Sequence, residues 1–430
     1  MRSANDAGLR AFPAFRFVSG RQHLLLPFGV QVLALSVPFV IVPYLTRVLD
    51  ARAFGEFAFC QAFAAVGAAL VDFGFQISAT RSLAEIRGDL AATHRRASGI
   101  LTAKFLNVLC FIGLVAVFYP VYPAFFQSPK MLASAAGFAI FQGLNFYWFF
   151  AGMQRVLTAS LFDLFARSLA GTGILLFVHS PSQAWIAVAS FAVGNACVFV
   201  LALMLAWRTA SGFALSWPEA KRSLAAGRHI FVQTVFGNIY VGATSFILGL
   251  FVSPYFVGTF SAAEKLIRAA QLPQLPIRLV AYPRVVVAVA RSRDEGRRLI
   301  LRLAGIVLPI MGLGSSILFL AAGPIVKLVL GSRLAPAADL LRLMAFVPLL
   351  SSATDFMSIF WLLSIGRDRT VTAIVIVGLV CQICAILGFS YFWPGWAGAA
   401  AVFLSQSIVL LLCLAALRRE GLPVQSQTAV

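Results

Sequence analysis

The sequence predicts an all-α integral membrane protein of about twelve transmembrane helices, arranged as two parallel six-helix repeats around a central cavity. Three observations support this prediction: the composition, a series of long apolar stretches and a weak internal repeat. Of the 430 residues, 60% are hydrophobic and only 11% are charged. Such a composition is typical of chains embedded in a lipid bilayer.

Long apolar stretches follow one another along nearly the whole chain. About 20 apolar residues are enough for a helix to cross the hydrocarbon core. The stretches leave little sequence for a soluble domain, so any function is expected to lie within the membrane. The predicted spans are 24–45, 54–76, 97–119, 131–151, 158–179, 184–207, 229–251, 255–282, 301–322, 337–363, 370–391 and 395–417.

The net charge of +19 is unevenly distributed among the connections. With the N-terminus inside, 23 of the 34 Lys and Arg lie on the cytoplasmic side and five on the opposite side. This bias predicts a multi-pass membrane protein with both termini in the cytoplasm, and it argues against nucleic acid as a partner. A bacterial inner membrane is the expected location. The first 23 residues lack an early apolar core, so a cytoplasmic tail is expected there instead of a signal peptide.

A weak internal repeat divides the chain into two similar halves. Residues 49–57 resemble 252–260 at an offset of 203, and residues 152–159 resemble 366–373 at an offset of 214. Each half has an even number of spans, which predicts parallel repeats with a substrate site at their interface near mid-membrane. The predicted organisation is a tail (1–23), an N-lobe (24–207), a basic cytoplasmic loop (208–228), a C-lobe (229–417) and a second tail (418–430).

Basic residues within the spans are the candidate substrate contacts, because a charge at the bilayer centre is costly unless it faces a cavity or a partner. In the eighth span, Glu264, Arg268 and Arg278 fall on one helical face, and two prolines are expected to bend the helix beside them. The alternative is a Glu264–Arg268 pair with Arg278 snorkelling to the interface. The candidate cavity cations are Arg268, Arg278, Lys265, Arg167 and Lys104.

Four acidic residues within the spans are candidates for charge pairs or for coupling to H⁺ or Na⁺. Asp163 is four residues from Arg167, which also fits a structural salt bridge. Asp355 lies in mid-span with no obvious local partner, whereas Asp72 also fits a helix end. With Glu264 these complete the set Asp72, Asp163, Glu264 and Asp355. No His or Cys pattern predicts a metal, and neither a cofactor nor a disulfide framework is expected.

Several motifs resemble a known family. Phe54-Gly-Glu-Phe57, followed by the segment 72–81, resembles the start of the lipid-linked oligosaccharide flippases of the Wzx type. These belong to the superfamily of multidrug, oligosaccharidyl-lipid and polysaccharide exporters. The segment 257–268 and Tyr282-Pro-Arg284 resemble the second-half signature of the same family. One departure is that 240–247 carries no charge, where relatives often have a charged residue.

The resemblance implies a flippase that moves polyprenyl-diphosphate-linked oligosaccharides to the outer leaflet by alternating access, for O-antigen or other cell-surface polysaccharide biosynthesis. Polysaccharide polymerase or glycosyltransferase machinery would be its partners. Buried arginines suit a diphosphate, because they form charge-assisted, often bidentate contacts. The alternative is an ion-coupled secondary transporter of small anionic or drug-like solutes on the same fold. An enzyme is not expected, since an acyltransferase would bring a His at membrane depth and a polymerase a long outer loop, and the sequence predicts neither.

Overall fold

The structure is a computed structural model that describes residues 22–86, 88–119, 128–210 and 212–419. Within these ranges every regular element is a helix and no strand occurs, so the predicted all-α membrane fold is confirmed. Ten helices in this part of the chain are long and apolar enough to cross a membrane. The predicted tails 1–23 and 418–430 lie outside the described residues, apart from their innermost two positions.

The helices have the following bounds. The first half contains α1 (Gln22–Val48), α2 (Ala51–Asp72), α3 (Phe75–Glu85), α4 (Leu90–Phe118), α5 (Pro129–Gly143), α6 (Tyr147–Gly152), α7 (Val156–Phe177), the short η2 (Pro181–Gln183) and α8 (Ala184–Thr209). The second half contains α9 (Trp217–Gly242), α10 (Thr244–Gly249), α11 (Pro254–Gln271), α12 (Gln274–Arg291), α13 (Arg293–Leu320), α14 (Ala322–Val329), η3 (Ser332–Leu334), α15 (Ala337–Met344), α16 (Val347–Met357), the π-helix η4 (Ser358–Leu363), α17 (Asp368–Phe392) and α18 (Ala397–Arg419).

Ten of the predicted spans coincide with the ten candidate membrane helices. The other two are interrupted: 131–151 covers α5 and α6, and 229–251 covers the end of α9 and α10. The connection expected at 208–228 is shorter than predicted, since α9 begins at Trp217. Pro218 lies in the first turn, where a missing N–H costs nothing. The count of twelve crossings and the duplicated layout stay predictions.

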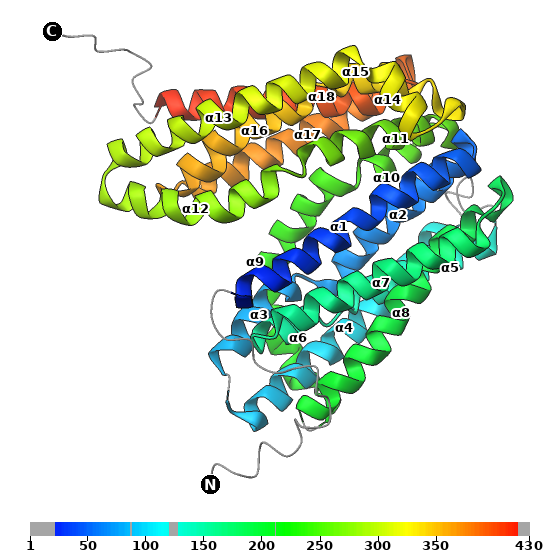
Figure 1. Cartoon of the computed structure of the whole chain (residues 1–430). Helices are drawn as coiled ribbons and strands as arrows, with labels where there is room; N and C mark the ends of the chain where they lie inside the picture. The colour runs from blue at the N-terminus through cyan, green and yellow to red at the C-terminus, as the bar shows by residue number, and fades with distance from the viewer. Residues whose placement is uncertain (1–21, 87, 120–127, 211, 420–430) are drawn as a thin grey trace.

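The helices form two bundles that meet at one end and diverge at the other (Figure 1). Helices α1 to α8 make the first bundle and α10 to α18 the second, and α2 packs against α11 where they meet. We call the end that contains residues 48–51 and 253–254 the closed end. The opposite end is called the basic end, because Arg208 in the last turn of α8, Arg291 in the last turn of α12 and Arg95 and Arg96 near the start of α4 lie there.

The connection between α8 and α9 is fastened to the first bundle by one face of α4. The backbone N–H of Ala214 donates to Ser98 Oγ at 3.0 Å, and that of Ser216 donates to Thr102 Oγ1 at 3.1 Å. One turn earlier, His94 Nδ1 lies 2.9 Å from a carbonyl oxygen of the same connection. Helix α9 then packs against α4 and also contacts α17 of the second bundle. The connection is therefore a fixed part of the first bundle.

Two glycines allow α2 and α11 to cross in direct backbone contact near the closed end. A Cβ at Gly55 would overlap the carbonyl oxygen of Pro254, and a Cβ at Gly258 would overlap that of Ala51. The contact is reciprocal, and both pairs are related by the repeat offset of 203. Glycine is the residue that permits such close approach of two backbones. We call this contact the glycine crossing.

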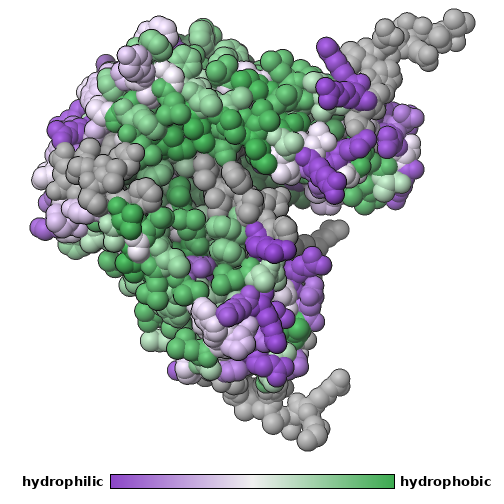
Figure 2. Space-filling view, turned by 180° about the vertical axis from the view of Figure 1, so that it is seen from behind, coloured by the Kyte–Doolittle hydropathy of each residue, from purple (hydrophilic) through white to green (hydrophobic). Residues whose placement is uncertain are grey.

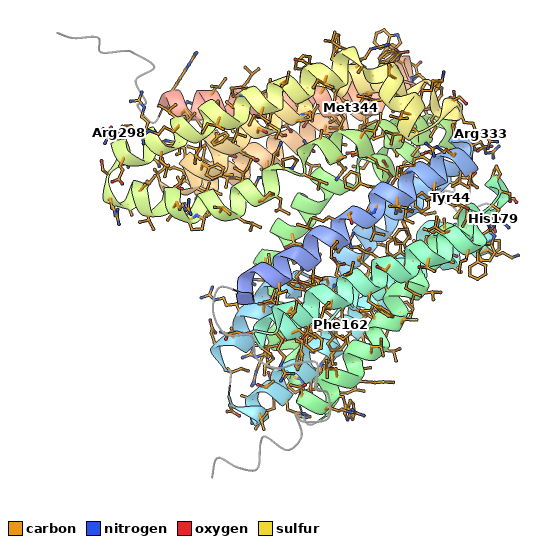
Figure 3. All side chains as sticks on the ribbon, viewed as in Figure 1. Tyr44, Phe162, His179, Arg298, Arg333 and Met344 are labelled. Atoms are coloured by element: carbon orange, nitrogen blue, oxygen red, sulfur yellow. The ribbon has the colours of Figure 1, made fainter. Side chains whose placement is uncertain are left out.

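Two arginines add a second reciprocal contact between the bundles at the closed end. Arg47 at the end of α1 donates to the Leu328 carbonyl in α14 at 2.8 Å. Arg333 donates to the Val48 carbonyl at 3.2 Å, so each arginine caps a helix of the other bundle. Carbonyls at helix C-termini lack intrahelical partners and favour positive charge. Figure 3 labels Arg333 and Tyr44 at this end, with Arg298 at the far tip of the second bundle.

The glycine crossing predicts that an added methyl group will separate the bundles. Gly258→Ala is expected to destabilise the purified protein by about 1–3 kcal/mol, the usual cost of overpacking, measured by thermal unfolding. Gly312→Ala in α13 is the matched control, because a Cβ there meets nothing within 4 Å. Equal stability of the two variants would contradict the crossing.

Candidate functional site

A hollow separates the two bundles at the basic end (Figure 2). Hydrophilic residues gather on both of its rims, whereas the surrounding faces are largely hydrophobic. The hydrophobic faces suit contact with lipid, and the hydrophilic rims suit contact with water. The polar residues of α2 and α11 that lie between the glycine crossing and the basic end are therefore the natural candidates for a site.

The first cluster on this side of the crossing is centred on α11. Helix α11 supplies Ser261, Glu264, Lys265 and Arg268, the neighbouring α10 supplies Ser245, and α2 supplies Gln61; we call these six residues the apical cluster. Gln61 and Glu264 each lie six residues beyond a crossing glycine, about 9 Å along their helices. The cluster thus lies directly beside the main contact between the bundles.

Lys265 links the two bundles within the apical cluster. Its ammonium donates to Gln61 Oε1 at 2.9 Å, from α11 to α2. Both side chains are partly buried. Lys265 thus bonds an amide across the boundary, and it directly follows the carboxylate of Glu264 in its own helix. Gln61 and Glu264 occupy matching positions of the two halves, at the repeat offset of 203.

Arg268 and Glu264 form the ion pair that the sequence analysis left open as the alternative. The guanidinium donates to Glu264 Oε1 at 2.7 Å, and the arginine side chain stays 40% exposed while the glutamate is 14% exposed. Ser245 donates to the second carboxylate oxygen at 3.3 Å and also bonds Ser261 at 2.7 Å. With two cations and one carboxylate, the apical cluster carries one net positive charge.

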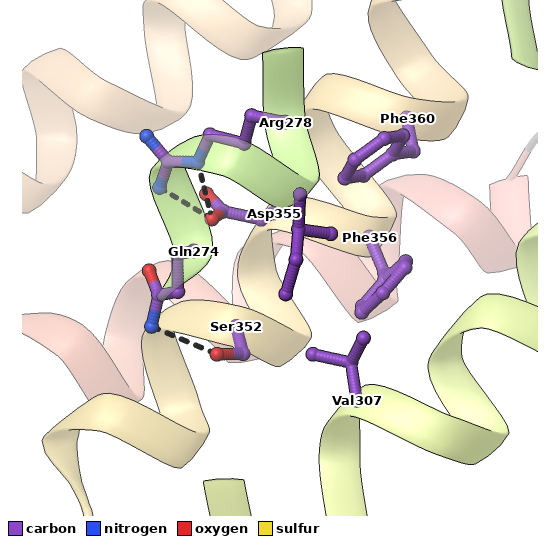
Figure 4. Close-up of a pocket in the computed structure, with 8 residues that line it drawn as sticks. Gln274, Arg278, Val307, Ser352, Asp355, Phe356 and Phe360 are labelled. Atoms are coloured by element: carbon purple, nitrogen blue, oxygen red, sulfur yellow. Dashed lines mark hydrogen bonds and ion pairs between the residues drawn. The ribbon is translucent and has the colours of Figure 1, made fainter. Parts of the chain in front are cut away.

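The carboxylate predicted to lack a partner is paired. Asp355 in α16 accepts from Arg278 Nε in α12 at 2.7 Å, so the expectation of an unpaired group is wrong. These two helices are neighbours in space although 77 residues separate the two side chains, which hid the pair from sequence inspection. Figure 4 shows the pair at a small pocket, where Gln274 also donates to Ser352 at 2.8 Å.

Lys104 does not lie on a cavity wall, contrary to the sequence expectation. It is fully buried, and its ammonium donates to Asp72 at 2.7 Å and to the Gly143 carbonyl at 2.7 Å. Asp72 also accepts from the N–H of Gln76 in the first turn of α3. This ion pair therefore joins the break between α2 and α3 to the end of α5. Broken helices inside a membrane need such partners for their free backbone groups.

Arg167 and Asp163 form the predicted pair within one turn of α7. Arg167 Nε lies 3.0 Å from both carboxylate oxygens, and both side chains are about one-third exposed. The pair satisfies both charges locally, which fits the structural role left open by the sequence. It lies in the first bundle, whereas the charged residues of the apical cluster lie in α11 of the second.

Two polar partners escaped the sequence prediction. Gln61 and Ser245 are uncharged residues in apolar spans and gave no local signal. The internal repeat did carry a signal for Gln61, because the offset of 203 matches Gln61 with Glu264 in the other half. Among the described residues, no group of three or more His, Cys, Asp and Glu side chains could hold a metal ion.

The fold is shared with solved transporters. An inward-facing multidrug resistance transporter of the MATE family matches with a TM-score of 0.68 and 13% identity, covering 93% of this chain and 99% of that chain. The lipid II flippase MurJ in an inward closed conformation matches with a TM-score of 0.72 and 12% identity, covering 93% and 88%. The fold is thus that of a multi-pass membrane transporter.

Sequence relatives define the family more narrowly. Residues 23–289 match the family described as "Polysaccharide biosynthesis protein", and the chain belongs to that family. The "Putative O-antigen transporter" of Escherichia coli (strain K12) is 25% identical over 415 residues, covering 95% of this chain and 99% of the relative. That of Shigella dysenteriae is 23% identical over 412 residues, covering 93% and 100%. The family expected from the motifs is confirmed.

The buried Lys104–Asp72 pair predicts a stability effect. Lys104→Met should destabilise the protein by about 3–5 kcal/mol, because it leaves a buried carboxylate without its partner. Thermal unfolding in detergent measures this loss. The control is Lys327→Met, at an exposed lysine of α14. Equal unfolding temperatures for the two variants would refute the structural role.

Proposed function

We propose that the protein is a flippase that moves polyprenyl-diphosphate-linked oligosaccharides from the cytoplasmic to the outer leaflet by alternating access. The observation that carries the proposal is the net positive apical cluster, which lies beside the contact between two bundles of a transporter fold. Membership of a polysaccharide biosynthesis family supports the glycan as cargo. The two "Putative O-antigen transporter" relatives support a role in surface glycan assembly.

The chemistry of the cargo fits the two kinds of surface between the bundles. A diphosphate must shed water to cross the membrane, and a guanidinium replaces that water with charge-assisted, often bidentate hydrogen bonds. Arg268 is 40% exposed, so it can bind an anion while Glu264 holds it in place. The sugars would occupy the hydrophilic hollow, and the lipid tail would stay in the bilayer between the diverging bundles.

The charge distribution supports an orientation of the molecule in the membrane. The basic end would face the cytoplasm of a bacterial inner membrane, with both termini on that side. The bundles diverge there, so the structure would represent an inward-facing state ready to accept cargo. Glycosyltransferase or polymerase machinery is the proposed partner, and neighbouring genes for such enzymes would support this link.

A small anionic solute is the competing cargo on the same fold. The positive apical cluster suits either anion, and it disfavours cationic drugs by like-charge repulsion. The two cargoes differ in their lipid tail. Transport of the diphosphate-linked glycan between leaflets, with no uptake of small organic anions, is the result that favours the flippase.

Arg268 provides the direct test. Arg268→Ala should abolish surface glycan in a strain that depends on this gene while the protein remains inserted in the membrane, and Arg268→Lys should restore only part of it because it loses the bidentate geometry. Immunoblots for glycan and protein measure both quantities. Arg342→Ala is the control, because Arg342 forms a similar short-range ion pair with the exposed Asp339. Normal glycan in the Arg268→Ala strain would remove this residue from the site.

Asp355 is our candidate for coupling transport to a proton or sodium gradient. Its carboxylate is 12% exposed beside a small pocket, where protonation or cation binding would release Arg278. Asp355→Asn should therefore flip cargo in reconstituted vesicles at a rate that no longer responds to either gradient. Asp339→Asn, at an exposed ion pair, should keep the response. A wild-type rate that is unchanged when both gradients are collapsed would rule out the coupling.

A further inference from the structure

The Lys265–Gln61 hydrogen bond differs from the neighbouring ion pair in one respect. Arg268 and Glu264 belong to the same helix, so their pair survives any movement of the bundles. Lys265 instead reaches from α11 to α2, across the boundary between the bundles. This hydrogen bond can exist only while α2 and α11 remain packed together.

The position of Gln61 ties this hydrogen bond to the glycine crossing. Gln61 lies six residues beyond Gly55 on α2, and Lys265 lies seven residues beyond Gly258 on α11. Helices are stiff over such a short length, about 10 Å. Separation of the backbones at the crossing would therefore also withdraw Gln61 from Lys265.

We propose that Lys265 exchanges Gln61 for an anionic oxygen of the cargo, and that this exchange couples cargo binding to opening of the closed end. The inference rests on the proposed function, because it requires an anionic cargo. An ammonium left without a partner at membrane depth is costly, so the empty protein keeps its closed end shut. A diphosphate oxygen supplies a stronger, charge-assisted hydrogen bond and removes this obstacle.

The exchange gives the cargo a different affinity for the two states. With Gln61 in place, Lys265 is engaged, and the anion must compete with the amide. With Gln61 withdrawn, Lys265 is free for the anion alone. A ligand shifts a conformational equilibrium only through such a difference. One hydrogen bond to a charged group corresponds to a change of about 10- to 100-fold in the ratio of open to shut states.

The experiment measures the closed end directly. Nitroxide labels on Arg52→Cys and Tyr255→Cys report the separation of α2 and α11, because both residues are exposed and directly follow the crossing residues Ala51 and Pro254. The full chain is used, with its six native cysteines replaced and reconstituted in lipid nanodiscs. Farnesyl diphosphate is the probe anion, and farnesol is its uncharged control.

The expected results follow from the state that each variant favours. In the otherwise unchanged protein, farnesyl diphosphate should lengthen the distance between the labels and farnesol should not. Gln61→Ala and Lys265→Met should shift the equilibrium toward the open distance by about 10- to 100-fold without any ligand. Lys265→Met should also lose its response to the diphosphate. Gln61→Glu should stay shut with the diphosphate present, because it offers Lys265 a carboxylate.

A second glutamine provides the matched control. Gln76→Ala, at an exposed glutamine of α3, should behave like the wild type. If Gln61→Glu and Lys265→Met respond to the diphosphate as the wild type does, the exchange is overturned and the anionic cargo stands. If the wild type ignores the diphosphate while Gln61→Ala still opens the closed end, the diphosphate cargo is overturned and the exchange with it. Size-exclusion profiles identify any variant that fails to fold, and the remaining variants then decide.

Discussion

Close backbone contact between α2 and α11 is the constraint on which the arrangement of the bundles depends. Gly55 and Gly258 remove the two side chains that would hold the helices apart. The resulting contact lies near one end of both helices, so the bundles can meet there and diverge toward the other end. It also brings Gln61 within hydrogen-bonding distance of Lys265. The hollow, the apical cluster and the closed end all follow from the same crossing.

Two of the charges within the helices, Lys104 and Lys265, differ in the helices that they join. Lys104 and Asp72 join broken helices within one bundle, and they supply partners for backbone groups that the breaks leave free. Lys265 joins the two bundles through a neutral amide. Replacing Lys104 is expected to destabilise the fold, whereas replacing Lys265 is expected to alter the balance between states. Which effect is expected depends on the bundle that holds the partner of the charge, and not on how deeply the charge lies in the membrane.

Much of the fold was predictable because apolar length and the placement of arginines are local properties of the sequence. The pairs Glu264–Arg268 and Asp163–Arg167 were predictable for the same reason, since a spacing of four residues places both groups on one helical face. The partners of Asp355 and Lys104 were not, because they come from other helices, 77 and 32 residues away. Lys104 in particular was expected to face a cavity, yet it lies by the break between α5 and α6, where its ammonium donates to two carbonyl oxygens. The repeat offset was the one sequence signal for a contact between the bundles, through the two glycines and through Gln61 and Glu264.

The α8–α9 connection is hydrogen-bonded to α4 of the first bundle. As a result, the boundary between the packed bundles does not coincide with the boundary between the predicted repeats. By ancestry, the predicted duplication assigns α9 to the second unit. By packing, its opening turns belong to the first, since a Cβ at Gly99 of α4 would lie 2.5 Å from Glu219 Cβ and the Phe73 and Phe231 rings stack at 4.1 Å. Chimeras that swap whole halves between relatives at this connection would mismatch the α4–α9 interface. A splice placed after Phe231 would keep these two contacts within one parent sequence.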